Sequence, residues 1–238
     1  MPDPLQLLLD IQDRDLVADQ LRHRRTTLPE RVALTEQQAA VARVDRELVD
    51  LGAQLAEVQR AQKRLEDEVA TLDAKAAAEN TKMYSGTVTS PRELQAMQEE
   101  IEALGRRQRT LEDELLDLME KAEPLSEEIT TLEARRVELS TEGDRLTIAI
   151  ADNEVAIDAE LAQVADARTA VVADLPADLL ATYEKLRPHL GGIAVARLEG
   201  TQCTGCHLSL PATELDAVRR AKPGEVAYHE ECGRILVR

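Results

Sequence analysis

Two short motifs near the C-terminus carry the residue types that bind metal ions. In Cys203-x2-Cys206 and in His229-x2-Cys232, two residues separate one potential ligand from the next. Such a knuckle presents both ligands on one side of a tight turn, and two facing knuckles complete a tetrahedron. Three thiolates and one neutral imidazole give Zn²⁺ a closed shell, which leaves no position for an activated water. The sequence therefore predicts one structural zinc ion per chain.

Two alternatives to this ligand set remain open in the sequence. His207 is a second histidine close to the knuckles, but it directly follows Cys206, and adjacent side chains tend to point apart. We therefore prefer His229 as the fourth ligand. Alternatively, the three cysteines are unligated thiols, although the knuckle spacing of both pairs favours metal binding over that interpretation and over a disulfide framework.

The segment that must position these ligands is short. Residues 174–238 begin with Asp174-Leu175-Pro176, and we expect helices over 177–187 and 212–221, β-prone runs over 193–198, 226–228 and 235–237, and a turn at Pro223-Gly224. Residues 193–238 are too few to hold a hydrophobic core alone, so we expect their folding to depend on zinc.

Most of the preceding chain has a seven-residue apolar repeat. Over residues 41–76 and 94–171, Leu, Val, Ile and Ala recur at alternating spacings of three and four, as in a coiled-coil seam. The chain has no Phe, no Trp and three Tyr, which suits a coiled coil because aliphatic side chains fill its knobs and holes. The predicted fold is mainly α: an antiparallel coiled-coil hairpin over residues 1–173, followed by a small α+β zinc-ribbon module over 174–238.

The repeat stops at residues 80–91, which we interpret as the tip loop of the hairpin. Gly86 supplies backbone freedom there, and Ser90-Pro91-Arg92-Glu93 has the pattern of a capping box with Pro at the first helical position. The first helix is therefore expected to end near residue 79 and the second to start at Pro91.

Three further prolines predict features of the helices. Asp3-Pro4 has the pattern of an N-cap, and Thr27-Leu28-Pro29-Glu30 predicts a break near residues 26–29. Folding the arms about the tip places Pro29 opposite the region of Gly143, where we expect a shared bend. Pro124 predicts a kink in the second arm.

Composition excludes several classes of function. No run of eighteen apolar residues is present, and residues 1–4 lack the pattern of a signal peptide, so we expect a cytoplasmic protein without a membrane contact. The formal charge of −17 opposes a general affinity for nucleic acid. No phosphate-binding glycine loop, activated nucleophile or open metal site is evident, so we expect no enzymatic activity and no small-molecule substrate.

The tip and the knuckles together resemble a known family. Tyr84-Ser85-Gly86-Thr87-Val88-Thr89-Ser90-Pro91, Cys203-x2-Cys206 and Cys232-Gly233-Arg234-Ile235-Leu236 are similar to the bacterial C4-type zinc-ribbon, coiled-coil family once catalogued as a domain of unknown function. The resemblance covers essentially the whole chain. It implies zinc binding, and either nucleic-acid binding or a chaperone-like regulatory role. Family ribbons have four cysteines, whereas here the third ligand is His229, which is an acceptable zinc ligand.

Two functions follow from these observations. In the first, the chain is an adaptor or chaperone-like scaffold that binds a protein partner through the ribbon or through the tip, where the candidate contacts are Lys82, Met83, Tyr84 and Arg92. In the second, the ribbon binds RNA or DNA through Arg219, Arg220, Lys222 and Arg234. Acidic residues outnumber basic ones in the ribbon and no aromatic platform is available for stacking bases, so we favour the adaptor.

A basic cluster at residues 22–25 invites the same nucleic-acid interpretation. In the folded hairpin this cluster faces an acidic stretch over residues 144–158, so we expect charge pairing between the arms instead. The hairpin satisfies its own seam, and the chain is expected to be a monomer or a homodimer.

Overall fold

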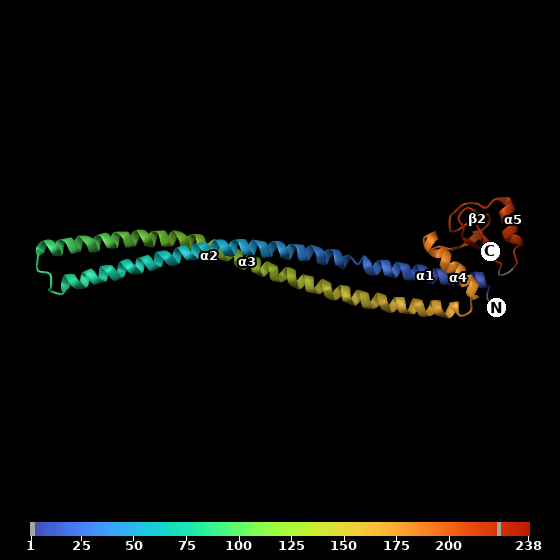
Figure 1. Ribbon diagram of the computed structural model, residues 1–238, viewed down its shortest axis with the longest axis horizontal. Helices are drawn as coiled ribbons and strands as arrows, with labels where there is room; N and C mark the ends of the chain where they lie inside the picture. The colour runs from blue at the N-terminus through green and yellow to red at the C-terminus, as the bar shows by residue number, and fades with distance from the viewer. Residues whose placement is uncertain (1–2, 223–224) are drawn as a thin grey trace. The chain divides into compact units, whose positions relative to one another are not determined.

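Figure 1 shows the computed structural model of the chain, which describes residues 3–222 and 225–238. The turn predicted at Pro223-Gly224 lies outside the described residues. The predicted fold class, long helices in a hairpin followed by a small C-terminal sheet, is confirmed. Contacts divide the chain into two units, Met1–Val32 with Leu146–Arg238, and Ala33–Arg145. No helix in the described part of the chain combines the length and apolarity needed to span a membrane.

The unit Ala33–Arg145 is a helical hairpin. It contains most of α2 (Pro29–Tyr84) and the first part of α3 (Pro91–Val172), which run side by side from the connecting loop (Figure 1). Heptad positions meet between the two helices, and the buried ones are Val44, Met97, Leu111 and Leu139. Ion pairs flank this seam, between Arg136 Nε and Asp45 Oδ1 at 2.6 Å and between Arg107 and Glu68 at 3.7 Å.

The tip is tighter than the sequence predicts. Helix α3 begins at Pro91 as expected, but α2 continues to Tyr84, so the connection comprises only residues 85–90. Residues 80–84 contain no glycine or proline, so none of them breaks the helix. The chain reverses at Gly86, whose φ of +75° is a backbone conformation that a residue with a Cβ rarely adopts.

The other unit begins with α1 (Pro4–Thr26), which packs along the part of α3 that follows Leu146. The Asp3 side chain accepts a hydrogen bond from the Leu5 amide at 3.1 Å, which confirms the predicted N-cap. Helix α1 ends at Thr26 and α2 starts at Pro29, so the predicted break is also confirmed. Helix α3, in contrast, continues through Pro124 without interruption.

The predicted alignment of Pro29 with Gly143 is wrong. Glu30 accepts a hydrogen bond from Asn153 Nδ2 at 3.4 Å, so the residues of α3 that face Pro29 lie about ten positions beyond Gly143. Gly143 instead faces the Leu34 side chain. The extra length of α2 at the tip accounts for about five residues of this shift, as the facing pair Arg107 and Glu68 shows. The rest accumulates along the arms, since Arg136 faces Asp45 and Asn153 faces Glu30.

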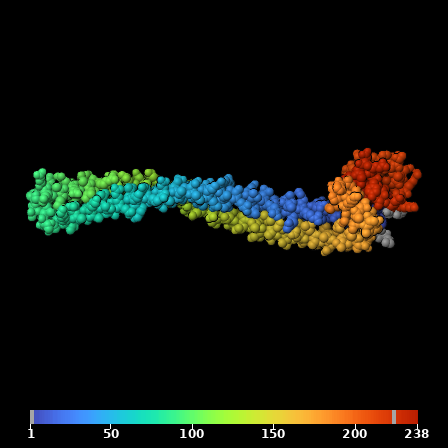
Figure 2. Space-filling model, viewed as in Figure 1, coloured from blue at the N-terminus to red at the C-terminus, as the bar shows by residue number. Residues whose placement is uncertain are grey.

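After α3 the chain forms α4 (Ala177–Leu186), a 3₁₀ helix η1 (Arg187–Leu190) and the ribbon. The ribbon contains β1 (Val195–Glu199), β2 (Gln202–Cys203), α5 (Ala212–Arg220), β3 (Ala227–Tyr228) and β4 (Ile235–Val237). The sheet has the strand order β2-β1-β4-β3, in which β1 and β4 are parallel and the outer pairs are antiparallel. Figure 2 shows this segment, coloured red, gathered into one packed body next to α4.

The sheet is joined to α1 by a buried amide. Gln12 Nε2 donates to the Val195 carbonyl and Gln12 Oε1 accepts from the Val195 amide, both at 2.8 Å. The side chain therefore pairs with the backbone as a neighbouring strand would, at the first residue of β1. Around it lies an apolar core shared by α1, α4 and the sheet, whose fully buried members include Leu8, Ile11, Tyr183, Ala194 and Ile235.

Candidate metal centre and its support

The structure brings together the four ligands that the sequence predicts. One ligand atom from each of Cys203, Cys206, His229 and Cys232 lies within 4.8 Å of the other three. Cys203 and His229 are buried, and the other two are partly buried. Zn–S bonds of about 2.3 Å and Zn–N bonds of about 2.0 Å require a similarly small cluster, so this donor set fits one tetrahedral zinc ion.

The orientation of His229 identifies its ligating nitrogen. Nδ1 lies 3.2 Å from Cys206 Sγ and 3.1 Å from Cys232 Sγ, so it faces the thiols. Nε2 is buried and has no hydrogen-bond partner within the described residues. The imidazole therefore suits coordination through Nδ1, with the proton on Nε2. His207, in contrast, is exposed, has φ of +60° and is not part of the cluster.

The first knuckle is built at the end of β1 and β2. Thr204 is held by Arg197 through two hydrogen bonds, from the Thr204 amide to the Arg197 carbonyl at 3.0 Å and from the Arg197 amide to Thr204 Oγ1 at 2.9 Å. The His207 amide donates to the Cys203 carbonyl at 2.8 Å and closes the turn. These bonds fix the backbone between Cys203 and Cys206, so both sulfurs are directed to one side.

The second knuckle lies between β3 and β4. The His229 amide donates to the Arg234 carbonyl at 2.9 Å, and the Gly233 amide donates to the His229 carbonyl at 2.7 Å. Gly233 has φ of +70°, which a residue with a side chain rarely adopts. Burial raises the pKa of the Cys232 thiol, but hydrogen bonds with Arg234, His229 and Cys206 together outweigh burial and lower it to about 7. Near neutral pH, a substantial fraction of this thiol is therefore ionised to the thiolate, which is the form that binds metal.

The Arg234 side chain extends from the second knuckle across the first and bonds to the backbone that precedes β1. Its Nε donates to the Ile193 carbonyl at 2.9 Å, and its terminal nitrogen donates to the Leu190 carbonyl at 3.4 Å. The side chain lies across Gly205: a Cβ at Gly205 would approach Arg234 Cδ to 2.5 Å and Ala196 Cβ to 3.0 Å. The absence of a side chain at position 205 is therefore what allows Arg234 to cross the first knuckle.

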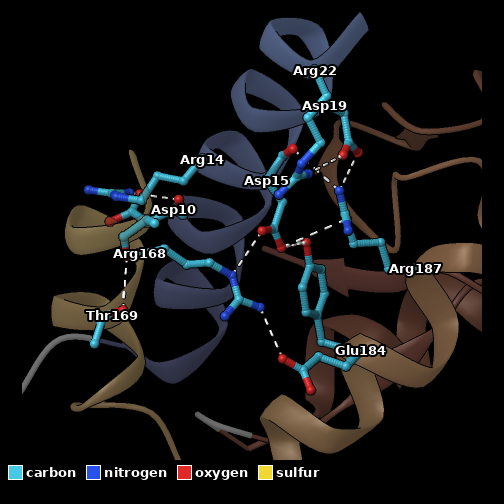
Figure 3. Close-up of polar contacts among 11 residues, drawn as sticks. Asp10, Arg14, Asp15, Asp19, Arg22, Arg168, Thr169, Glu184 and Arg187 are labelled. Atoms are coloured by element: carbon cyan, nitrogen blue, oxygen red, sulfur yellow. Dashed lines mark hydrogen bonds and ion pairs between the residues drawn. The ribbon is translucent and has the colours of Figure 1, made fainter. Parts of the chain in front are cut away.

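A buried polar network holds the ribbon-bearing segment on the helices. Asp15 of α1 accepts from Tyr183 Oη and from Arg168 Nε, both at 2.8 Å, and Figure 3 shows Asp15 between Arg168 and Arg187. Arg168 also donates to Glu184 at 3.0 Å, and Arg187 pairs with Asp19. The network thus joins α1, α3, α4 and η1. Burial and the Asp15 carboxylate raise the pKa of Tyr183 well above its usual 10.

This network was not predicted from the sequence, and no local signal indicates it. Asp15, Arg168 and Tyr183 lie far apart in the chain, and each is an ordinary residue of an amphipathic helix. The predicted pairing of the basic cluster with α3 is seen for Arg25, whose Nε lies 3.0 Å from Asp158 Oδ1. Arg22 pairs with Asp19 on its own helix instead.

The predicted contact residues at the tip and on the ribbon have different surroundings. At the tip, Lys82, Tyr84 and Arg92 are exposed, and Met83 is partly buried. On the ribbon, Arg234 is engaged by backbone carbonyls, and Arg220 pairs with Asp216 at 3.1 Å. Arg219 donates to the Gly200 carbonyl at 3.4 Å, and Lys222 is exposed.

Known proteins share both parts of the chain. Residues 11–191 match the CT398-like coiled coil hairpin domain, and residues 202–236 match the C4-type zinc ribbon domain. The chain belongs to the CT398-like coiled-coil hairpin family. The ribbon match and the Cys/His cluster together identify the cofactor as a structural zinc ion. In this CT398-like protein His229 stands where a C4-type ribbon has cysteine.

Relatives of this CT398-like protein cover nearly its full length. The Mycobacterium tuberculosis protein Rv2229c is 30% identical over 97% of the chain and 94% of its own length. A solved structure from Mycobacterium smegmatis has a TM-score of 0.86 at 28% identity, covering 99% of this chain and 97% of that one. CT398 from Chlamydia trachomatis has a TM-score of 0.67 at 22% identity, covering 98% and 96%, which shows a shared fold.

Proposed function

We propose that this CT398-like protein is a non-enzymatic adaptor that binds a protein partner through the tip of its hairpin. The observation that carries the proposal is Tyr84, whose side chain is 79% exposed at the last residue of α2. The chain contains only three tyrosines and no Phe or Trp. Tyr and Arg are enriched in the energetic centres of interfaces, and Arg92 is exposed on the other side of the same loop.

The chemistry of the metal centre supports a non-enzymatic role. Four protein ligands fill a tetrahedral zinc shell, so no position is left for a substrate or an activated water. The hydrogen bonds around the cluster hold the knuckle backbone. In our proposal the zinc ion stabilises the ribbon, and the hairpin presents the tip.

Binding to nucleic acid is less well supported by the same residues. Arg234 and Arg220 already have protein partners, and Arg238 donates to the carbonyls of Arg219, Ala221 and Lys222 at the end of α5. Arg234 and Arg238 are thus bonded to backbone carbonyls and Arg220 to a carboxylate, which leaves them less available for phosphate. The formal charge of −17 opposes phosphate further.

Site-specific photo-crosslinking in the host cell tests the proposal. A photoreactive phenylalanine replaces Tyr84 in one variant and Val49, which is 71% exposed on the flank of α2, in the matched control. We expect a discrete adduct at position 84, absent at position 49, that protease removes and nuclease does not. Equal labelling at both positions, or an adduct that nuclease removes, would contradict the adaptor.

Anisotropy titrations with single-stranded RNA and duplex DNA address the alternative directly. A protein that contacts six or more phosphates loses about a thousandfold in affinity between 50 and 200 mM salt. We expect no saturable binding of either nucleic acid at the lower salt concentration. Tight binding with that salt dependence would make this a nucleic-acid-binding protein.

A further inference from the structure

The outer edge of β3 has no strand neighbour in the described part of the chain. It is the last strand in the order β2-β1-β4-β3, and its pairing with β4 uses one edge only. His229 donates its amide to Arg234 of the β4 side, so alternation along the strand directs the backbone groups of Tyr228 to the outer edge. The Tyr228 side chain is 45% exposed beside it.

A groove of about 360 Å³ runs along this edge, with α5 as its other wall. Its apolar lining comes from Ala217, Val218 and Ala221 of α5, and from Val226, Ala227 and Tyr228 of the strand side. One backbone amide on this edge already has a side-chain partner: the Glu230 amide donates a hydrogen bond to Glu214 Oε1 at 2.9 Å. An extended peptide placed in the groove could form backbone hydrogen bonds with the outward-facing amide and carbonyl of Tyr228.

The groove is acidic. Its charged lining residues are Glu214, Glu225 and Glu230, and no Lys or Arg is among its lining residues. None of the three forms an ion pair with another described residue. Glu214 is only 8% exposed, and its Oε2 has no hydrogen-bond partner in the described part of the chain. A largely buried carboxylate without a counterion makes the groove favourable for a cationic ligand.

We propose that this groove binds a basic, extended segment of a protein partner, which adds as a strand to the outer edge of β3. Backbone hydrogen bonds to Tyr228 supply the affinity, apolar side chains cover Ala217 and Val218, and Lys or Arg side chains meet the carboxylates. The inference extends the adaptor proposal, on which it rests, by adding a second contact site and the chemistry of its ligand.

The test uses the full-length zinc-loaded protein and an alternating Lys-Val hexapeptide amide as the probe. In amide-resolved NMR spectra we expect saturable shifts at Val226, Tyr228 and Ala217, with the tip resonances of Tyr84 unchanged. A peptide of the same composition, N-methylated at alternate residues, keeps the charge but cannot add as a strand, and we expect it not to bind. Equal binding of both peptides, or no shift along β3, would overturn the inference.

A charge variant with a matched control completes the test. Glu230→Lys reverses a charge that lines the groove, and we expect about three- to tenfold weaker peptide binding. Glu231→Lys makes the same change at the neighbouring exposed position, outside the lining, and should leave affinity within about twofold. Zinc content is measured for both. Equal effects of the two substitutions would contradict the site, whereas the tip is tested independently by crosslinking at Tyr84.

Discussion

Removing one hydroxyl group tests whether the network around Asp15 holds the base of the hairpin and α4 together. The Tyr183 side chain is fully buried, and its hydroxyl donates to Asp15 Oδ2 at 2.8 Å. Tyr183→Phe keeps the ring and its apolar burial and deletes only this bond. A hydrogen bond to a charged group is worth about 1.5–3 kcal/mol. Because Asp15 retains Arg168, we expect a loss of about 1.5–2 kcal/mol in the free energy of unfolding.

The same substitution has a distinct dependence on pH. Burial and Asp15 raise the pKa of Tyr183 above its usual 10, so the unfolded chain loses this proton first as pH rises. Wild-type stability therefore contains a contribution that is complete below pH 10 and falls by about 1.4 kcal/mol per pH unit above it. The Phe variant lacks this dependence, so its deficit relative to the wild type should shrink between pH 10 and 11.

Urea unfolding followed by circular dichroism measures both effects, with the midpoint and its slope compared at each pH. Tyr228→Phe is the matched control, because it removes a hydroxyl from a partly exposed tyrosine, and we expect a change within about 0.5 kcal/mol. The reasoning is refuted if Tyr183→Phe is as stable as Tyr228→Phe at pH 8, or if its deficit is the same at pH 8 and pH 11.

Three other substitutions test the hairpin and the ribbon by unfolding and metal competition. Gly205→Ala should lower the free energy of unfolding by about 1–3 kcal/mol, because the added methyl group displaces the hydrogen-bonded Arg234 side chain. Gly105→Ala, in open space on α3, should raise it by about 0.5–1 kcal/mol. Equal effects of the two substitutions would contradict the close approach of Arg234 to Gly205. Leu111→Ala, fully buried, should cost about 2–5 kcal/mol, and Leu116→Ala, mostly exposed, much less. His229→Cys restores four thiolates and should hold zinc against a chelator at least as well as the wild type, a prediction that weaker retention would refute.

The helices and the ligand set could be predicted from the sequence because each has a local signal. The heptad repeat, the cap at Asp3, the start of α3 at Pro91 and the two knuckles depend on residues a few positions apart. The exact end of α2 had no such signal, because residues 80–84 are compatible with either helix or turn. That error of five residues accounts for about half of the displacement of the predicted partner of Pro29.

Contacts between distant segments could not be predicted in this way. Gln12 pairs with the backbone of Val195, and Asp15 meets Tyr183, across 183 and 168 positions of the sequence. Neither residue is unusual for the polar side of a helix, so only the packed structure distinguishes them from solvated neighbours. The acidic groove beside β3 likewise depends on the position of α5, which spacing does not determine.

The most direct test of the account is the zinc content of the purified chain, measured by mass spectrometry for the wild type, Cys203→Ser, His229→Ala and His207→Ala. The account predicts one zinc per chain in the wild type and in His207→Ala, and loss of zinc with unfolding of residues 193–238 in the other two. A wild-type chain without zinc, or a Cys203→Ser variant that retains it, would contradict the metal centre on which the ribbon depends.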